Sequence, residues 1–302
     1  MKAVRLIIAT TLLLAAATYA ADYNVDGNFS KGEFIQLAVD SNDALYALDS
    51  AGTITRFKSD GSVEASISTE VAKAGAFALA SDGTFLVFSN ITEMKKVKSG
   101  ARMVKVDVPI GVECTVFDAS GQQLKKSKID CLKSVKTARF IDGRLAIADL
   151  TARALVIIDP ETFTETGRIT DGLRLCCGIF DFCEAPDNTI AISNLGAFKV
   201  QQYSLDGKRI MEFGKRGRKL DDFQGCCNPV SAAYLPNGEI LTVEKDPTRI
   251  KIYDSKGTNA YQIEGVDELV KGCSFIPSAL DSKGTIYLAS ATKKSIVRCV
   301  RK

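Results

Sequence analysis

The stretch Pro229–Gly257, PVSAAYLPNGEILTVEKDPTRIKIYDSKG, carries the pattern that decides the fold. A short apolar strand is expected over Val230–Leu235, followed by a turn at Asn237-Gly238 and a second strand over Glu239–Val243. A polar connection then leads to a third strand, Arg249–Tyr253. Because Asn-Gly between alternating apolar runs is a strong hairpin signal, the stretch predicts a small antiparallel sheet.

The same order of strand, turn and strand recurs in six units of about 47 residues on average. The first unit runs from Ile35 to Gly61, and the second, which is the longest, has extra residues between about Ser89 and Glu113. The first hairpin turns of the later units fall at Asp142-Gly143, Asp187-Asn188, Asn237-Gly238 and Lys283-Gly284. A lone antiparallel sheet of this size cannot bury both faces, whereas sheets stacked around an axis bury their faces against each other.

The chain stops soon after the third strand of the sixth unit, so that unit lacks an outer strand. We expect residues near Tyr23 to Phe34 to supply it and to close the ring. The sequence therefore predicts an all-β fold, a six-bladed β-propeller of four-stranded antiparallel blades closed by an N-terminal strand, in a single domain over 21–302. The alternatives are a pair of β-sandwiches, which the lack of a linker disfavours, and a β-solenoid, which the repeat length disfavours.

The first twenty residues predict export. Lys2 and Arg5 precede the apolar run Leu6–Ala17, and the small residues Thr18 and Ala20 stand at positions −3 and −1 of a cleavage site before Ala21. This is the pattern of a secretory signal peptide over residues 1–20, and it predicts a periplasmic or secreted protein. A run of about a dozen apolar residues is too short to span a bilayer, and no later stretch is longer, so we expect no membrane span.

Composition excludes several classes of site. The chain has no His and no Trp, and its formal net charge is +3. Without His there is no Ser-His-Asp triad, no His-based zinc site and no c-type haem attachment, so any metal would be held by thiolates, carboxylates or backbone oxygens. The near-neutral charge balance gives no electrostatic reason to bind nucleic acid.

The fourth and fifth units resemble the NHL-repeat family of propellers. The connection between blades in that family is matched by Phe213-Gly214, Gly217, Phe223 and Pro229. The blade body is matched by Asn237-Gly238, Ile240, Val243, Arg249, Ile250, Tyr253, Asp254 and Gly257. The resemblance is weaker in the other units. It implies a propeller and often a binding role, but no particular activity, because NHL-like propellers include scaffolds, sensors and a few metal-dependent enzymes.

Cysteine recurs at one place in four consecutive units. Cys131 lies eleven residues before its hairpin turn, and Cys177, Cys227 and Cys273 each lie ten residues before theirs. Two of these positions are doublets, Cys176-Cys177 and Cys226-Cys227. Since the first strand of every propeller blade lines the axis, the four positions are expected to meet at one mouth of the central channel.

Three interpretations of these cysteines remain open. The first is a thiolate site for a soft metal ion (Zn, Cu or Fe) or an iron–sulfur cluster. Its best candidate ligands are Cys177, Cys227 and Cys273, with Cys176, Cys226 or Cys131 as the fourth. The second is disulfides, including vicinal ones within a doublet, and the third is inert buried thiols. Cys183 is expected to point into the channel or to pack, and Cys114 and Cys299 are expected in the core.

Polar residues are expected near the same mouth: Asp181, Asn194, Asn228, Glu244 and Asp246. They could form a hard-cation site, as in gluconolactonase-like propellers, which the chain resembles in architecture only; solvated loop carboxylates are the simpler interpretation. The basic insertion of the second unit is expected to be a lid or a docking loop, and Lys208–Lys219 a charged loop between blades.

Three functional hypotheses follow. The first is a non-enzymatic exported propeller whose cysteine-lined mouth binds metal or a small ligand, carries electrons or senses redox state. The second is an enzyme on the same axis, either a metal-dependent hydrolase or lyase or a thiol oxidoreductase. The third is a scaffold for a protein partner with structural disulfides.

Overall fold

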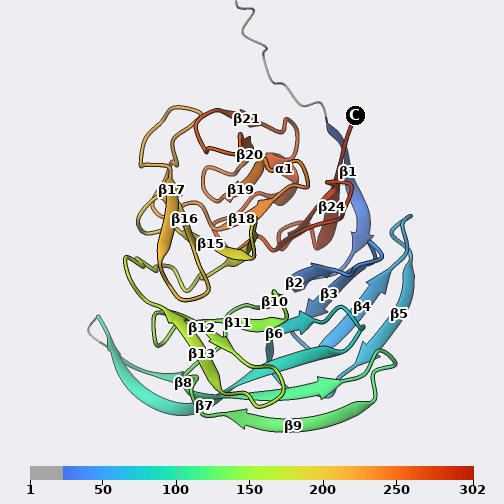
Figure 1. Cartoon of the computed structure of the whole chain (residues 1–302), viewed down its shortest axis with the longest axis vertical. Coiled ribbons are helices and arrows are strands. Elements are labelled where there is room, and N and C mark those ends of the chain that lie inside the picture. Colours follow the sequence, from blue (N-terminus) through green and yellow to red (C-terminus); the bar gives the residue numbers. More distant parts are fainter. Residues whose placement is uncertain (1–22, 101) are drawn as a thin grey trace, which may run out of the picture.

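The computed structural model describes residues 23–100 and 102–302. The predicted signal peptide, residues 1–20, lies outside this part of the chain. The described residues form six antiparallel four-stranded sheets arranged around a central axis, which confirms the predicted six-bladed β-propeller (Figure 1).

The first three blades are each built from four consecutive strands. Blade 1 contains β2 (Phe34–Val39), β3 (Leu45–Asp49), β4 (Thr53–Phe57) and β5 (Val63–Ser68). Blade 2 contains β6 (Ala74–Leu79), β7 (Phe85–Ser99), β8 (Arg102–Phe117) and β9 (Gln123–Ile129). Blade 3 contains β10 (Ala138–Ile141), β11 (Arg144–Asp149), β12 (Ala154–Ile158) and β13 (Glu165–Ile169).

The last three blades repeat this arrangement, with one strand exchanged in the sixth. Blade 4 contains β14 (Phe182–Ala185), β15 (Thr189–Asn194), β16 (Lys199–Tyr203) and β17 (Arg209–Phe213). Blade 5 contains β18 (Ser231–Tyr234), β19 (Ile240–Glu244), β20 (Arg249–Tyr253) and β21 (Ala260–Gln262). Blade 6 contains β22 (Ser278–Leu280), β23 (Ile286–Ser290), β24 (Ser295–Arg301) and β1 (Tyr23–Lys31), and a short helix, α1 (Asp267–Val270), precedes it.

The N-terminal strand closes the ring as predicted. β1 pairs antiparallel with β24, in a register that runs from Tyr23 opposite Arg301 to Lys31 opposite Ser295. The hydrogen bonds of this pairing cover an edge that blade 6 would otherwise expose. The two ends of the described chain therefore meet in one blade.

The core lies between the blades, where the middle strands are buried on both faces. All five residues of β12, β19 and β20 are buried, and these strands are rich in Val, Ile and Leu. The innermost strand of every blade lines an axial cavity of about 280 Å³. Gln36 of β2 lines this cavity and connects three blades. Its amide nitrogen donates to the carbonyl oxygens of Phe77 (2.7 Å) and Ala138 (3.0 Å) in two other blades.

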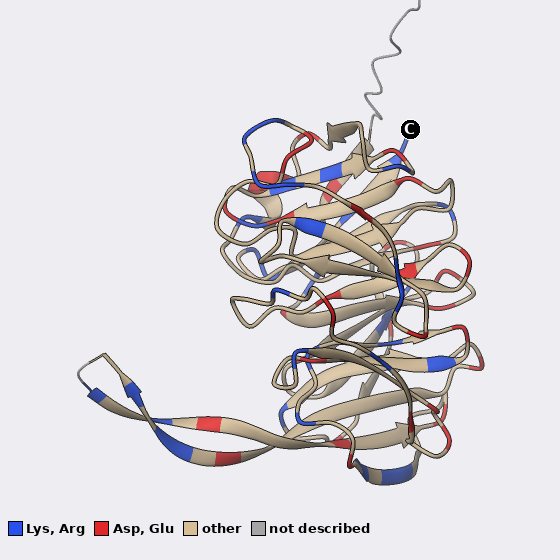
Figure 2. Cartoon of the chain, turned by 60° about the vertical axis from the view of Figure 1, so that its left-hand side comes forward, with Lys and Arg blue, Asp and Glu red and all other residues tan. Residues whose placement is uncertain are grey.

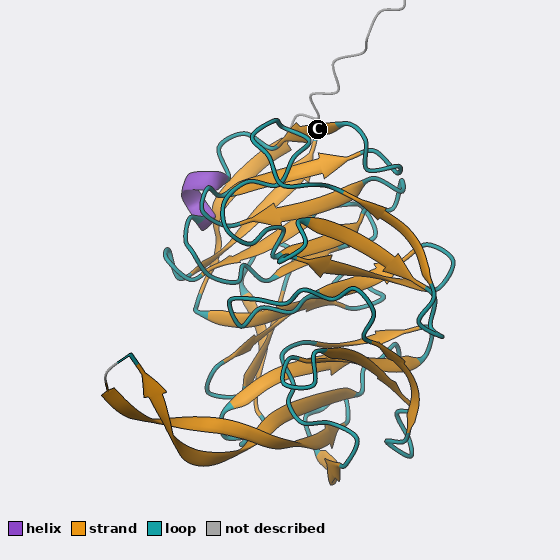
Figure 3. Ribbon diagram, turned by 90° about the vertical axis from the view of Figure 1, so that its left-hand side faces the viewer, coloured by secondary structure: helices purple, strands orange, loops and turns teal. Residues whose placement is uncertain are grey.

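The insertion in the second unit is not a loop but a continuation of the sheet. β7 and β8 stay paired from Phe85 opposite Phe117 to Ser99 opposite Arg102, and they project from the propeller as a long two-stranded arm (Figures 2 and 3). The arm carries the basic residues Lys95, Lys96, Lys98, Arg102 and Lys105 and exposed apolar residues such as Met94 and Met103. No helix of the described residues is long and apolar enough to cross a bilayer.

Candidate thiol site at the channel mouth

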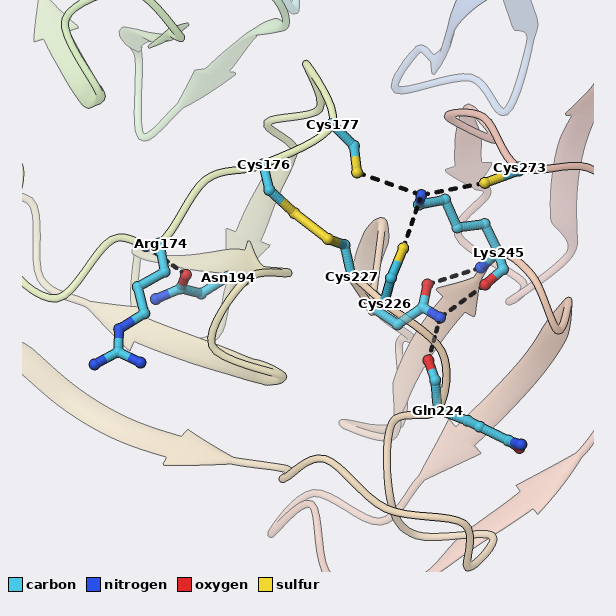
Figure 4. Close-up of a disulfide and its surroundings, with 10 residues drawn as sticks. Arg174, Cys176, Cys177, Asn194, Gln224, Cys226, Cys227, Lys245 and Cys273 are labelled. Atoms are coloured by element: carbon cyan, nitrogen blue, oxygen red, sulfur yellow. Dashed lines mark hydrogen bonds between the residues drawn. A yellow bond between two sulfur atoms is a disulfide. The ribbon is translucent and has the colours of Figure 1, made fainter.

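Five cysteines from three neighbouring blades lie together at one mouth of the channel (Figure 4). Each comes from the loop that leads into the innermost strand of its blade, which we call the lead-in loop. Cys176 and Cys177 precede β14, Cys226 and Cys227 precede β18, and Cys273 precedes β22. We call this set the mouth cluster.

A disulfide joins Cys176 to Cys227, with 6.9 Å between the two Cα atoms. It links the first residue of one doublet to the second residue of the other, so it runs between blades 4 and 5 and is not vicinal. The sulfur of Cys177 lies within 4.8 Å of both sulfurs of this bond. Cys177, Cys226 and Cys273 remain free and exposed.

The three free thiols surround one ammonium group. The Nζ atom of Lys245 lies 3.5 Å from the sulfur of Cys273, 3.6 Å from that of Cys177 and 3.8 Å from that of Cys226. Lys245 is buried, and burial acts to lower its pKa, but the neighbouring Cys177, Cys226 and Cys273 together outweigh this effect and raise the pKa. The mouth cluster is therefore a place where sulfur and positive charge are held in contact.

Lys245 and the blade 5 doublet are held in place by Asn228. The backbone nitrogen of Lys245 donates to Oδ1 of Asn228 at 2.8 Å, and Nδ2 of Asn228 donates to the carbonyl oxygen of Lys245 at 2.7 Å. The same Nδ2 also donates to the carbonyl oxygen of Gln224 in the lead-in loop. Because Asn228 is fully buried, these bonds are shielded from competing water and fix the lysine beside the cysteines.

Two equivalent residues anchor the two doublets. Asn194 ends β15 and accepts a hydrogen bond from the backbone nitrogen of Arg174 (2.8 Å). Glu244 ends β19 and accepts one from the backbone nitrogen of Gln224 (2.9 Å). Each donor lies two residues before its cysteine doublet. In blades 4 and 5, the end of the second strand therefore fixes the position of the doublet at the mouth.

The buried oxygen donors expected at this mouth have other partners. Glu244 forms ion pairs with Lys251 (2.8 Å) and Arg249 (2.7 Å), and burial lowers the pKa of Lys251 to about 8 although Glu244 opposes this. Asp181 forms an ion pair with Arg139 at 2.9 Å. These groups stabilise the blades and do not form an open ring of ligands for a hard cation.

Cys131 lies apart from the mouth cluster. Its carbonyl oxygen accepts a hydrogen bond from Arg168 (3.3 Å), and its side chain packs against the apolar residues between blades 2 and 3. Burial raises the pKa of its thiol. Within the described residues, no disulfide or hydrogen bond connects its sulfur to the five cysteines of the mouth cluster.

The remaining cysteines are core residues. Cys114, Cys183 and Cys299 are buried, and burial raises the pKa of each thiol to about 12. Cys183 was expected to point into the channel or to pack in the core, and it does both. It lines the axial cavity and packs between blades 4 and 5. A thiol with so high a pKa is a poor nucleophile and a poor metal ligand near neutral pH.

Sequence reasoning missed Lys245. It named both chain neighbours of this residue, Glu244 and Asp246, as polar groups near the mouth, and Lys245 occupies the same connection between β19 and β20. The signal in the sequence was a lysine between two residues that were themselves expected at the mouth. A second cavity, of about 450 Å³, opens beside Cys273 and is lined in part by Asp246 and Lys271.

Comparison with known proteins identifies the fold and no more. No protein-family model matches the chain, and no curated protein matches it significantly. Solved structures do match over nearly all of its length. A streptogramin B lyase has a TM-score of 0.61 and 12% identity, over 93% of this chain and 98% of that one.

Two further matches point to the same architecture. A catalytically inactive virginiamycin B lyase from Staphylococcus aureus, determined with quinupristin, has a TM-score of 0.60 and 13% identity, over 93% of this chain and 100% of that one. The PQQ-bound aldose sugar dehydrogenase from Streptomyces coelicolor has a TM-score of 0.56 and 12% identity, over 93% of this chain and 99% of that one. The chain thus has the six-bladed propeller fold of the virginiamycin B lyase, a fold shared by proteins of different function.

Proposed function

We propose that this chain is an exported NHL-like propeller whose mouth cluster holds a soft metal ion or an iron–sulfur cluster, in a redox, electron-transfer or sensing role. The observation that carries the proposal is the convergence of three free thiols on one buried cation, with distances of 3.5–3.8 Å between each sulfur and Nζ of Lys245. Cysteine sulfurs gathered around one point are the ligands that a thiophilic cation prefers.

A metal ion is expected to bind the three sulfurs more tightly than the ammonium group of Lys245 does. Zinc binds thiolate sulfur at about 2.3 Å, whereas the ammonium only makes long hydrogen bonds, so a metal displaces it. The long, flexible stem of Lys245 lets its charged end withdraw without moving the backbone that Asn228 holds. Two electrons from an added thiol reductant would open the disulfide to the thiols of Cys176 and Cys227, either of which would supply a fourth ligand beside Cys177, Cys226 and Cys273.

A binding or redox role is favoured over hydrolysis by the surroundings of the mouth cluster. The chain has no His to act as a general base, and Glu244 and Asp181 are engaged in ion pairs. We propose the periplasm or the outside of the cell as its location. The partners that this role requires are the metal or a small ligand, together with a protein that exchanges electrons with it.

Metal analysis of reduced protein, purified without oxygen and reconstituted with zinc or with iron and sulfide, tests the proposal. We expect one ion or one cluster per chain, and iron with a broad visible absorption band identifies a cluster. The triple variant Cys177→Ser, Cys226→Ser, Cys273→Ser is expected to lose the metal, because it removes the exposed thiolates.

The matched control is Cys299→Ala, a buried thiol of β24 that should leave the metal content unchanged. Far-UV circular dichroism of each variant confirms that the propeller is folded. Stoichiometric metal in the folded triple variant, or its absence from the reduced wild-type protein, would refute the proposal.

One observation favours a second candidate, a thiol–disulfide oxidoreductase. The sulfur of Cys177 lies within 4.8 Å of both sulfurs of the disulfide, a placement from which a thiolate could attack either one after a small rotation. Metal-free protein would then exchange disulfides with glutathione, and Cys177→Ser would abolish this exchange. Equal exchange rates in the variant and the wild-type protein would exclude this candidate.

A further inference from the structure

The contacts of Lys245 have a chemical consequence that does not depend on metal. Its Nζ atom touches three sulfurs, and the shortest of these contacts, 3.5 Å, is to Cys273. An amine and a thiol held together this closely can be joined through a single oxygen atom when an oxidant is present. Figure 4 shows the lysine nitrogen between the three sulfurs.

We propose that Lys245 and Cys273 form an oxidative cross-link, a nitrogen–oxygen–sulfur bridge, when the metal-free protein meets dioxygen. The ammonium group of Lys245 first gives one proton to solvent; one thiol, the resulting amine and one dioxygen molecule then give the S–O–NH bridge and one water. The S–O and O–N bonds form, and the O–O, S–H and one N–H bond break. Sulfur and nitrogen each lose two electrons, and dioxygen gains all four.

Geometry favours Cys273 over the other two thiols. Cys226 lies at 3.8 Å from Nζ, and Cys177 at 3.6 Å already lies next to the disulfide, with which it can exchange. Cys273 is exposed and lines the cavity of about 450 Å³, so dioxygen reaches it from solvent. Oxidants reach exposed thiols more readily than buried ones.

The bridge would add a second covalent link between neighbouring blades. The disulfide joins blade 4 to blade 5, and a bond from Lys245 to Cys273 joins blade 5 to blade 6. It would also remove both the cation and one thiolate from the mouth cluster. The cross-linked protein is therefore expected to have lost the proposed metal site until a thiol reductant cleaves the bridge.

Intact-mass and peptide mass spectrometry of metal-free protein, before and after exposure to air, test this inference. We expect a mass gain of one oxygen atom less two hydrogens, and a cross-linked pair of peptides containing Lys245 and Cys273. One free thiol should disappear for each bridge, whereas a disulfide consumes two. Two molecules of dithiothreitol supply the four electrons that return the thiol and the amine and release one water, so the treated protein should match unexposed protein given the same reductant in mass and thiol count.

Two variants make the result decisive. Lys245→Arg keeps the positive charge but should form no bridge, and Cys273→Ser should form none either, while both keep the native circular dichroism spectrum. If the wild-type protein gains only whole oxygen atoms or loses only pairs of hydrogens, the inference is wrong. A bridge that persists in Cys273→Ser contradicts the assignment to that residue. Metal binding by the reduced protein is measured separately, so failure of either proposal leaves the other standing.

Discussion

Blades 2 and 5 place different chemistry at the same point of one fold. In blade 5 the lead-in loop carries Cys226 and Cys227, and the second strand ends at Glu244, which anchors that loop. In blade 2 the lead-in loop carries Lys73, whose Nζ contacts Oδ2 of Asp107 at 3.0 Å, and the second strand continues into the arm. The strands alone therefore specify where a lead-in residue lies, and the loop decides whether that place becomes a site.

The largest expected loss of stability comes from removing the disulfide between blades 4 and 5. Replacing both Cys176 and Cys227 by Ser removes a cross-link that spans 51 residues, and the free energy of unfolding should fall by about 4 kcal/mol. Urea unfolding without reductant measures this change. Wild-type protein unfolded in dithiothreitol should show the same loss, and a double variant as stable as the oxidised wild-type protein would mean that the bond is not formed in solution.

A smaller effect is expected when the loop loses its anchor but keeps its cysteines. Asn194→Ala removes the acceptor for the backbone nitrogen of Arg174 and leaves that group unpaired, at about 1–3 kcal/mol. Urea unfolding measures the change, and Cys177 should react faster with iodoacetamide because its loop is loosened. The exposed Asn42 provides the control, since Asn42→Ala should change neither quantity. An unchanged reaction rate in Asn194→Ala would show that the strand end does not position the doublet.

The smallest effect is expected at the equivalent place in blade 2. Lys73→Ala removes an exposed ion pair with Asp107, which contributes at most about 1 kcal/mol and less in high salt. Unfolding at low and at high salt measures both parts of this prediction. A loss of several kcal/mol would mean that the arm is braced against the propeller through this lysine, and the contrast between the two blades would disappear.

Most of the fold could be predicted from the sequence because the same pattern of strands and turns recurs in six units. The Asn237-Gly238 hairpin and its counterparts mark the blades, and the missing outer strand of the sixth unit required a strand such as Tyr23–Lys31. The approach of the cysteines of blades 4, 5 and 6 also followed from their equal distance to a hairpin turn. What that spacing could not give is the position of Cys131, whose partly buried side chain packs against apolar residues between blades 2 and 3.

The chemistry inside the mouth cluster was less accessible because it depends on side-chain direction. Spacing makes Cys177 and Cys227 equivalent, yet the disulfide joins Cys176 to Cys227, so equivalent residues do not share equivalent partners. Asn194 and Glu244 were expected as polar groups at the mouth, and their hydrogen bonds instead hold the lead-in loops. The extra residues of the second unit gave no indication of register, so their long hairpin could not be foreseen.

The pairing of β1 with β24 imposes an order of events on the growing chain. Synthesis proceeds from the N-terminus, so β1 waits without its neighbour until Ser295–Arg301 have been made. All five cysteines of the mouth cluster precede Ser295 in the chain, so they have been made by then. The ring is thus still open when its sulfurs first become available, and whichever of them react early decide which bonds remain for the closed molecule.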